Sequence, residues 1–299
     1  MLAYLSVELV IQLIINGILF GAMYGIAAIG MSLVFGTMRI LWLAQGTVII
    51  FFAYISFFLF DLLGVDPYLS LVIIIPFSLV CGVVFYQLLF REAAALEDKN
   101  VSLLLAVGLM FLAENLMTVF FTGNPRSINT EYATMVFRPF PFDVGFPLTR
   151  SIGLIMAVLS TIGVMLFLKK TYIGLAVRAA SQNMVWTTLM GVNPHWVNSM
   201  AFAIGIGLAG VAGVGLGTVY PFDPFYGFIF TLKAVIALAI GGIGSVVGAL
   251  LGGILLGMIE SMAGFFLSGG WADAVSFAVF LLVLMFKPEG LFARTTKKA

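Results

Sequence analysis

Three charged side chains, Glu114, Lys233 and Glu260, lie within long apolar stretches of the sequence. A charge in the hydrocarbon core of a bilayer costs roughly 3 kcal/mol or more, so such residues usually face the interior of a helix bundle and pair with one another. We therefore expect Lys233 to form a salt bridge with Glu114 or Glu260. The alternative interpretation is that these side chains contact a charged group of a transported solute.

Few residues in the sequence could form a metal site, a disulfide or a nucleotide-binding motif. The single histidine, His195, argues against a His-rich metal site, and the single cysteine, Cys81, excludes an internal disulfide. The segment GIGLAG at 205–210 matches GxGxxG, but it lies inside an apolar stretch and not between a strand and a helix, so it does not indicate dinucleotide binding. No P-loop motif is present. We expect no catalytic residue, no metal site and no bound cofactor on this chain.

The composition indicates that the three charged side chains belong to a membrane protein. Hydrophobic residue types make up 62% of the 299 residues and charged types 9%, whereas soluble domains carry about 25% charged residues. Mean hydropathy is +1.18, so lipid must cover much of the exterior. A net charge of +1 gives no positive electrostatic field that would attract nucleic acid.

The apolar stretches predict the fold. Because a spanning helix needs roughly 20 apolar residues, the sequence predicts about nine spans (8 to 10) in one all-α transmembrane domain over 1–299. The predicted spans are 9–35, 43–60, 69–90, 100–121, 150–168, 197–219, 225–243, 247–267 and 271–286.

Basic residues predict the orientation of the bundle, because cytoplasmic loops carry an excess of Lys and Arg. With the C-terminus inside, ten basic residues fall on the cytoplasmic side and three on the opposite side, which predicts an N-terminus outside the cell. The span at 225–243 is the weakest, since it contains Lys233. The cytoplasmic set is Arg39, Arg91, Lys99, Lys169, Lys170, Arg178, Lys287, Arg294, Lys297 and Lys298, and the outer set is Arg126, Arg138 and Arg150.

Many of the 33 glycines recur at helical spacing. Small residues on one helix face let two backbones approach closely. We interpret these glycines chiefly as packing residues, and a role in lining a pathway is the alternative. The GxxxG steps are formed by Gly17, Gly21 and Gly25, by Gly213 and Gly217, by Gly244, Gly248 and Gly252, and by Gly253 and Gly257.

The long inner connection at 169–196 has a helical pattern of its own. Residues 176–190 alternate polar and apolar positions as an amphipathic helix does, and Gly191 and Pro194 end the pattern. Such a helix suits docking into a groove of a soluble partner. Lying on the lipid surface is the alternative.

Five segments in order, over nearly the whole chain, make it resemble the permeases of branched-chain amino acid ABC importers. GAMYGIAAIGMSLVFG at 21–36 is similar to the first-helix signature of that family. TYIGLAVRAASQN at 171–183 with LMGVN at 189–193 resembles its coupling loop. LAGVAG at 208–213, LKA at 232–234 with GGIGSVVGALLGG at 241–253, and KPEGLF at 287–292 resemble its C-terminal half.

The resemblance implies a bacterial inner-membrane importer with several subunits. Two permeases, identical or different, pair in the lipid bilayer. Two cytoplasmic ABC ATPases bind ATP and Mg²⁺, and a periplasmic binding protein delivers the solute. It also implies that the connection 169–196 couples the permease to the ATPases through Arg178, Ala179, Ala180, Asn183 and Gly191.

One segment departs from the family pattern. Where the family usually has Asn-x-Ala-His-Gly followed by Gly-Ala-Tyr, this chain has WLAQG at 42–46 and FAY at 52–54. The resemblance places this segment near the translocation path, so the bulkier residues leave the solute open among amino acids, small organic acids and amides; repacking is the alternative. We expect path residues among Trp42, Gln45, Tyr54, Glu114, Lys233 and Glu260. A stand-alone, ion-coupled secondary transporter is the second interpretation, with Glu114 and Glu260 as its only coupling candidates.

Overall fold

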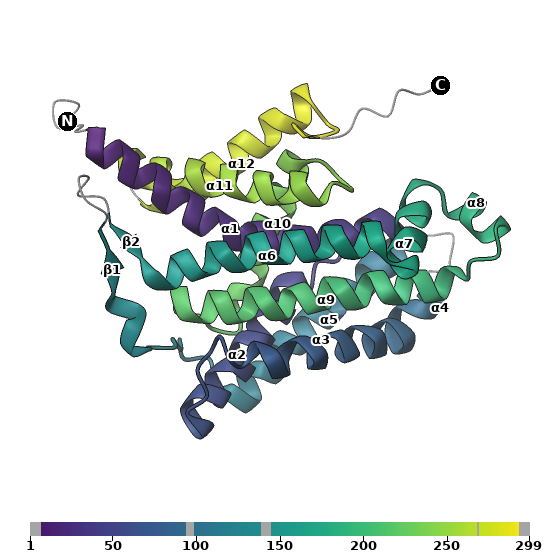
Figure 1. Cartoon of the computed structure of the whole chain (residues 1–299), viewed down its shortest axis with the longest axis horizontal. Helices are drawn as coiled ribbons and strands as arrows, with labels where there is room; N and C mark the ends of the chain where they lie inside the picture. Colours follow the sequence, from purple (N-terminus) through teal and green to yellow (C-terminus); the bar gives the residue numbers. More distant parts are fainter. Residues whose placement is uncertain (1–6, 94–98, 139–144, 268, 293–299) are drawn as a thin grey trace.

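A bundle of helices that run along one axis forms the structure (Figure 1). The computed structural model describes residues 7–93, 99–138, 145–267 and 269–292, which confirms the all-α prediction. The long helices are α1 (Val7–Met38), α2 (Gln45–Leu63), α3 (Leu71–Phe85), α5 (Lys99–Phe121), α6 (Leu148–Lys170), α9 (Pro194–Val219), α10 (Tyr226–Gly241), α11 (Val246–Leu267) and α12 (Gly269–Phe286). Helices are expected because a backbone in lipid must satisfy its own hydrogen bonds.

Each of the nine predicted windows overlaps one of these helices. In the described part of the chain, seven helical stretches are long and apolar enough to cross a membrane, and α10 and α12 are apolar but shorter. One of the seven is Leu71–Ala93, in which α3 continues through the π-helical turn η2 (Tyr86–Phe90) and α4 (Arg91–Ala93). The number of spans and their orientation stay predictions. Three basic residues used for the orientation, Arg294, Lys297 and Lys298, lie outside the described residues.

Two helices form the centre of the bundle. In the most apolar part of α9, 89% of the residues are buried, and in the most apolar part of α1, 83% are buried. The buried share is only 22% in α5 and 22% in the stretch Leu71–Ala93 that begins with α3. Helices that are apolar all round belong in the core of a large assembly or in lipid. Hence α1 and α9 pack against protein on nearly all sides, while α3 and α5 present apolar side chains to the outside of this chain.

Two of the predicted glycine stripes, Gly17 with Gly21 and Gly25 and Gly253 with Gly257, lie where α1 and α11 meet. A Cβ atom on Gly17 would lie 2.5 Å from the Cα of Met258, and one on Gly25 would lie 3.2 Å from the Cα of Leu250. Gly21 faces Gly253 in the same seam. The packing interpretation of these glycines is confirmed, because backbones this close leave no room for larger side chains.

The connection between α5 and α6 covers the end of the bundle at which α1 begins (Figure 1). It contains the 3₁₀ turn η3 (Glu131–Thr134) and a short antiparallel hairpin of β1 (Val136–Phe137) and β2 (Phe146–Pro147). The Tyr132 hydroxyl donates to Asp66 Oδ2 at 2.6 Å. Burial, and then this hydrogen bond, raise the pKa of Tyr132. The connection is thereby tied to the segment between α2 and α3.

At the opposite end, the connection after α6 folds as two helices, α7 (Tyr172–Gln182) and α8 (Met184–Leu189). The prediction of one amphipathic helix over 176–190 is wrong. Asn183 is extended, with φ −157° and ψ 108°, and its Oδ1 accepts a hydrogen bond from the backbone of Trp186 at 3.2 Å. A side-chain cap of this kind starts a new helix, so the chain turns at Asn183 and α8 folds back beside α7.

Candidate functional site

An exposed groove separates α7 from α8. Its volume is about 410 Å³. Large apolar side chains project there into the open, with Trp186 64% and Met190 82% exposed. A large apolar surface that a chain leaves exposed marks a site of contact with a protein partner or with a membrane. The groove is lined by Tyr172, Leu175, Ala176, Ala179, Gln182, Asn183, Trp186, Thr187, Met190 and Val192.

The coupling residues expected from the sequence divide into two groups. Arg178, Ala179, Asn183 and Gly191 are exposed, and two of them, Ala179 and Asn183, line the groove. Ala180 is 3% exposed, so its methyl group faces the rest of the bundle. Sequence reasoning missed the aromatic and sulfur side chains of the groove, although their large size in a polar connection is itself a signal.

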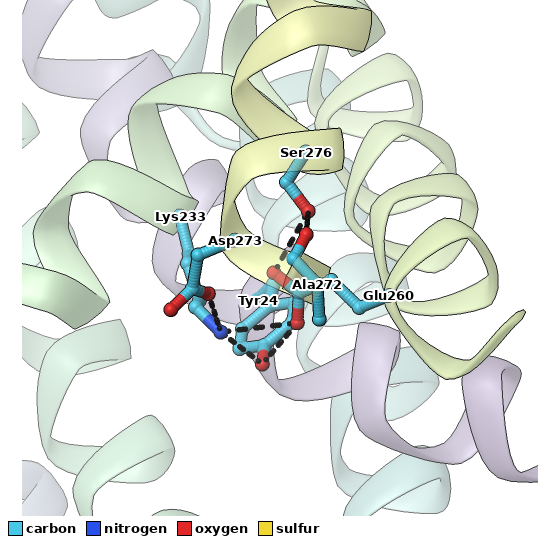
Figure 2. A network of polar contacts seen from close by, with 6 residues as sticks. All are labelled: Tyr24, Lys233, Glu260, Ala272, Asp273 and Ser276. Atoms are coloured by element: carbon cyan, nitrogen blue, oxygen red, sulfur yellow. Dashed lines mark hydrogen bonds and ion pairs between the residues drawn. The ribbon is translucent and has the colours of Figure 1, made fainter. Parts of the chain in front are cut away.

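A polar cluster joins four helices inside the bundle (Figure 2). Lys233 Nζ of α10 lies 3.1 Å from Glu260 Oε2 of α11 and 3.2 Å from Asp273 Oδ1 of α12. The Tyr24 hydroxyl of α1 donates to Glu260 Oε2 at 2.8 Å and accepts a hydrogen bond from Lys233 Nζ at 3.3 Å. Ser276 Oγ donates to Glu260 Oε1 at 3.2 Å. The predicted pairing of Lys233 is confirmed with Glu260.

Three cluster members were missed by the sequence argument: Ser276, and for different reasons Asp273 and Tyr24. Asp273 lies in the predicted span 271–286, so the rule that selected Glu260 applies to it equally. Tyr24 could not be singled out from the sequence, because tyrosine is common within membrane spans.

Among the described residues, no group of three or more His, Cys, Asp or Glu side chains could hold a metal ion.

The N-terminus of α2 is buried against α10. Gly46 N donates to Thr231 Oγ1 at 2.8 Å, and a Cβ atom on Gly46 would collide with the backbone oxygen of Gly227. Thr47 Oγ1 donates to Glu114 Oε1 of α5 at 3.4 Å. Glu114 is thus buried beside the first turn of α2, where the helix dipole favours a negative charge, and it is separate from the Lys233 cluster.

Trp42, Gln45 and Tyr54 are all fully buried in this conformation. The Trp42 ring packs edge-on against Phe90 and Phe202, with centroid distances of 5.2 and 4.9 Å. Tyr54 stacks on Phe121 at 4.8 Å. Gln45 Nε2 reaches the Gly205 oxygen at 3.5 Å.

The three buried side chains each contain a polar atom without a hydrogen-bond partner among the described residues. These atoms are Trp42 Nε1, Gln45 Oε1 and Tyr54 OH. Leaving a buried polar atom without a hydrogen-bond partner costs about 1–3 kcal/mol of stability. A different conformation or a bound ligand that supplies the missing partner would recover that free energy. Three of the six such atoms among the described residues thus lie on one segment of 13 residues, 42–54, and the other three belong to Thr130, Asn198 and Ser199.

Trp42→Ala is expected to destabilise the protein by about 3–5 kcal/mol, because truncating a fully buried tryptophan leaves a cavity. The measurement is the midpoint of thermal unfolding of the purified chain in detergent. Trp271→Ala on α12 is the control, since Trp271 is 62% exposed. Equal shifts for both variants would contradict the packing of Trp42 between two phenylalanine rings.

Comparisons with known proteins agree with this arrangement. Residues 13–284 match the family described as branched-chain amino acid transport system / permease component. The chain is 28% identical to the high-affinity branched-chain amino acid transport system permease protein LivH of Salmonella typhimurium, over 95% of this chain and 96% of the relative. It is 30% identical to BraD of Pseudomonas aeruginosa over the same shares.

A solved structure has the same fold. The chain matches PsaBC from Streptococcus pneumoniae, solved in complex with Fab, with a TM-score of 0.50 and 11% identity, over 92% of this chain and 91% of that one. The family match extends over nearly the whole bundle, from α1 to α12. The chain therefore belongs to the branched-chain amino acid transport permease family and is a multi-pass inner-membrane permease subunit of an ABC importer.

Proposed function

We propose that this permease carries a branched-chain or related amino acid, together with a second permease, two ABC ATPases and a periplasmic binding protein. The names of its relatives supply the solute class, since LivH and BraD are described as branched-chain amino acid permeases. The single observation that carries the assignment of partners is the apolar groove between α7 and α8. ATP and Mg²⁺ bind to the ATPases.

The α7–α8 surface suits an ATPase because it combines apolar area with a fixed shape. Thr171 caps α7 by accepting from Gly174 N at 2.9 Å, and Asn183 caps α8. The groove is therefore bounded by two helices with ordered starts. Burying Trp186 and Met190 against a partner would yield about 1.5–3 kcal/mol for each side chain before the costs of association.

Closure of the ATPases must favour one permease conformation through differential contacts. Ala180 and Val177 are buried toward the bundle, while Ala179 faces the groove. A displacement of α7 by the ATPases would therefore press directly on buried residues. We infer that α7 transmits the movement, with Arg178 and Gly191 at the exposed edge of the contact.

The segment 42–54 is our second proposal, as the part of the path that rearranges. Its buried atoms Trp42 Nε1, Gln45 Oε1 and Tyr54 OH lack partners in this conformation. A solute with polar groups, or a conformation open to water, would supply them. Glu114 beside Thr47 belongs to the same region.

The test is purification of the tagged chain from its native membrane in detergent, followed by mass spectrometry of the proteins that co-purify. A P-loop ATPase and a permease chain are expected, and uptake of L-leucine by the reconstituted complex should require ATP. A chain that purifies alone and still moves solute in vesicles without ATP would overturn the proposed partners.

A further inference from the structure

Lys233 is shared by two carboxylates, those of Glu260 and Asp273 (Figure 2). The two differ in how exposed they are. The side chain of Glu260 is 13% exposed and that of Asp273 is 60% exposed, while the side chain of Lys233 itself is 14% exposed. The two ion pairs have nearly equal lengths, 3.1 and 3.2 Å. The ammonium group of Lys233 therefore has one buried partner and one partner open to the surroundings.

The buried half of the cluster is fixed by further hydrogen bonds. Tyr24 OH donates to Glu260 Oε2 at 2.8 Å, and Ser276 Oγ donates to Glu260 Oε1 at 3.2 Å. Both carboxylate oxygens of Glu260 are thus occupied. Removing Glu260 would leave the buried ammonium group of Lys233 with only the exposed Asp273 as a partner, which is unfavourable.

The open half of the cluster is exchangeable. In the part of the chain that the structure describes, Asp273 is held at its carboxylate by Lys233 alone. An incoming carboxylate can replace Asp273 on Lys233 without leaving the ammonium group unpaired, because it supplies the same negative charge and the Lys233–Glu260 pair remains.

The charges of the cluster select the chemistry of the group that replaces Asp273. Lys233, Glu260 and Asp273 carry one positive and two negative charges. A simple anion on Lys233 would lie beside the displaced Asp273 carboxylate and be repelled by it. A simple cation would be attracted by Asp273 but repelled by Lys233. A solute with an ammonium group and a carboxylate on the same carbon satisfies both sites.

We propose that Lys233 and Asp273 form a binding site for the zwitterionic head of an amino acid, with the carboxylate on Lys233 Nζ and the ammonium group on Asp273. The inference rests on the proposed function and adds the part of the solute that is recognised. The four helices α1, α10, α11 and α12 meet at this site, so its occupation bears directly on how α12 is held to the bundle.

The test uses the complete importer with its partner subunits in proteoliposomes and measures ATP-dependent uptake of radiolabelled L-leucine. Asp273→Asn is expected to lower the maximal uptake per ATP hydrolysed by about ten-fold or more, because a charge-assisted contact to the ammonium group is lost. The amount of assembled complex should stay unchanged. Asp273→Glu keeps the carboxylate and should retain most of the uptake.

A matched control is Ala274→Asn, which adds an amide at the exposed neighbouring position on α12. It should transport leucine like the wild type. Uptake by Asp273→Asn within two-fold of wild type, or loss of assembled complex in Asp273→Asn and Asp273→Glu alike, would overturn the binding site. A wild-type importer that carries a solute without an ammonium group, such as urea, would also overturn it while the importer function stands. A wild-type complex that moves no solute with ATP would remove the proposed function itself, and the site with it.

Discussion

Gly253→Val is expected to prevent α1 and α11 from packing, so that little of the chain is recovered as a single species. A Cβ atom at this position would lie 2.5 Å from the Cα of Gly25 and 2.8 Å from the backbone oxygen of Gly21. Both are backbone atoms, so no side-chain rotation relieves the clash. Overpacking a core typically costs about 1–3 kcal/mol, and more where the backbone must move, against a total stability of about 5–15 kcal/mol.

The measurement is recovery of tagged protein as a monodisperse peak in size-exclusion chromatography from detergent. Gly264→Val is the matched control on the same helix, because a Cβ atom there meets nothing within 4 Å. It should be recovered like the wild type. Similar recovery of both variants would show that α1 and α11 are not as close as the structure places them.

The approximate positions of the helices, and the fact that one face of α1 makes a close helix contact, could be predicted from the sequence alone. Apolar length determines where a span can lie, and every predicted window overlaps a helix. The stripe of Gly17, Gly21 and Gly25 predicted a close helix contact, and α11 is the partner. The partner helix itself did not follow from the pattern, because many glycine stripes in the chain are chemically equivalent.

The break at Asn183 and the orientation of Ala180 could not be predicted. Asn183 occurs within a continuous helical pattern, and only its extended backbone and its bond to Trp186 N show that it caps a second helix. Ala180 lies next to the exposed Ala179 in sequence but faces the bundle. A one-residue step on a helix turns a side chain by about 100°, so a motif alone does not tell which alanine contacts a partner.

The partners of intramembrane charges were predictable only in part. The cost of burial required a partner for Lys233, but nothing in the sequence distinguished Glu114 from Glu260 as that partner. The structure places Glu114 at the start of α2 and Glu260 in the cluster with Lys233. The fold determines which carboxylate pairs with Lys233, because α11, which carries Glu260, follows α10 after a short turn and packs against it, whereas α5, which carries Glu114, does not pack against α10.

Trp186→Asp combined with Met190→Asp is expected to leave the chain inserted in the membrane but without its ATPase. Met190 is the most exposed apolar side chain that lines the α7–α8 groove, and Trp186 is the most exposed of the others apart from Tyr172. Two carboxylates in their place would have to lose water on contact with a partner, which disfavours binding by several kcal/mol. ATPase co-purified with the tagged chain should fall about ten-fold or more, and ATP-dependent uptake should be lost with it.

Thr188→Asp is the control, because Thr188 is exposed on the same short helix and does not line the groove. It adds a carboxylate at the same end of the molecule, so it corrects for a general effect of charge. Equal amounts of ATPase with both variants would place the contact elsewhere on this end of the bundle. Loss with the double variant alone would show that the partner binds between α7 and α8, and therefore that the turn at Asn183 shapes the surface through which ATP hydrolysis acts on the permease.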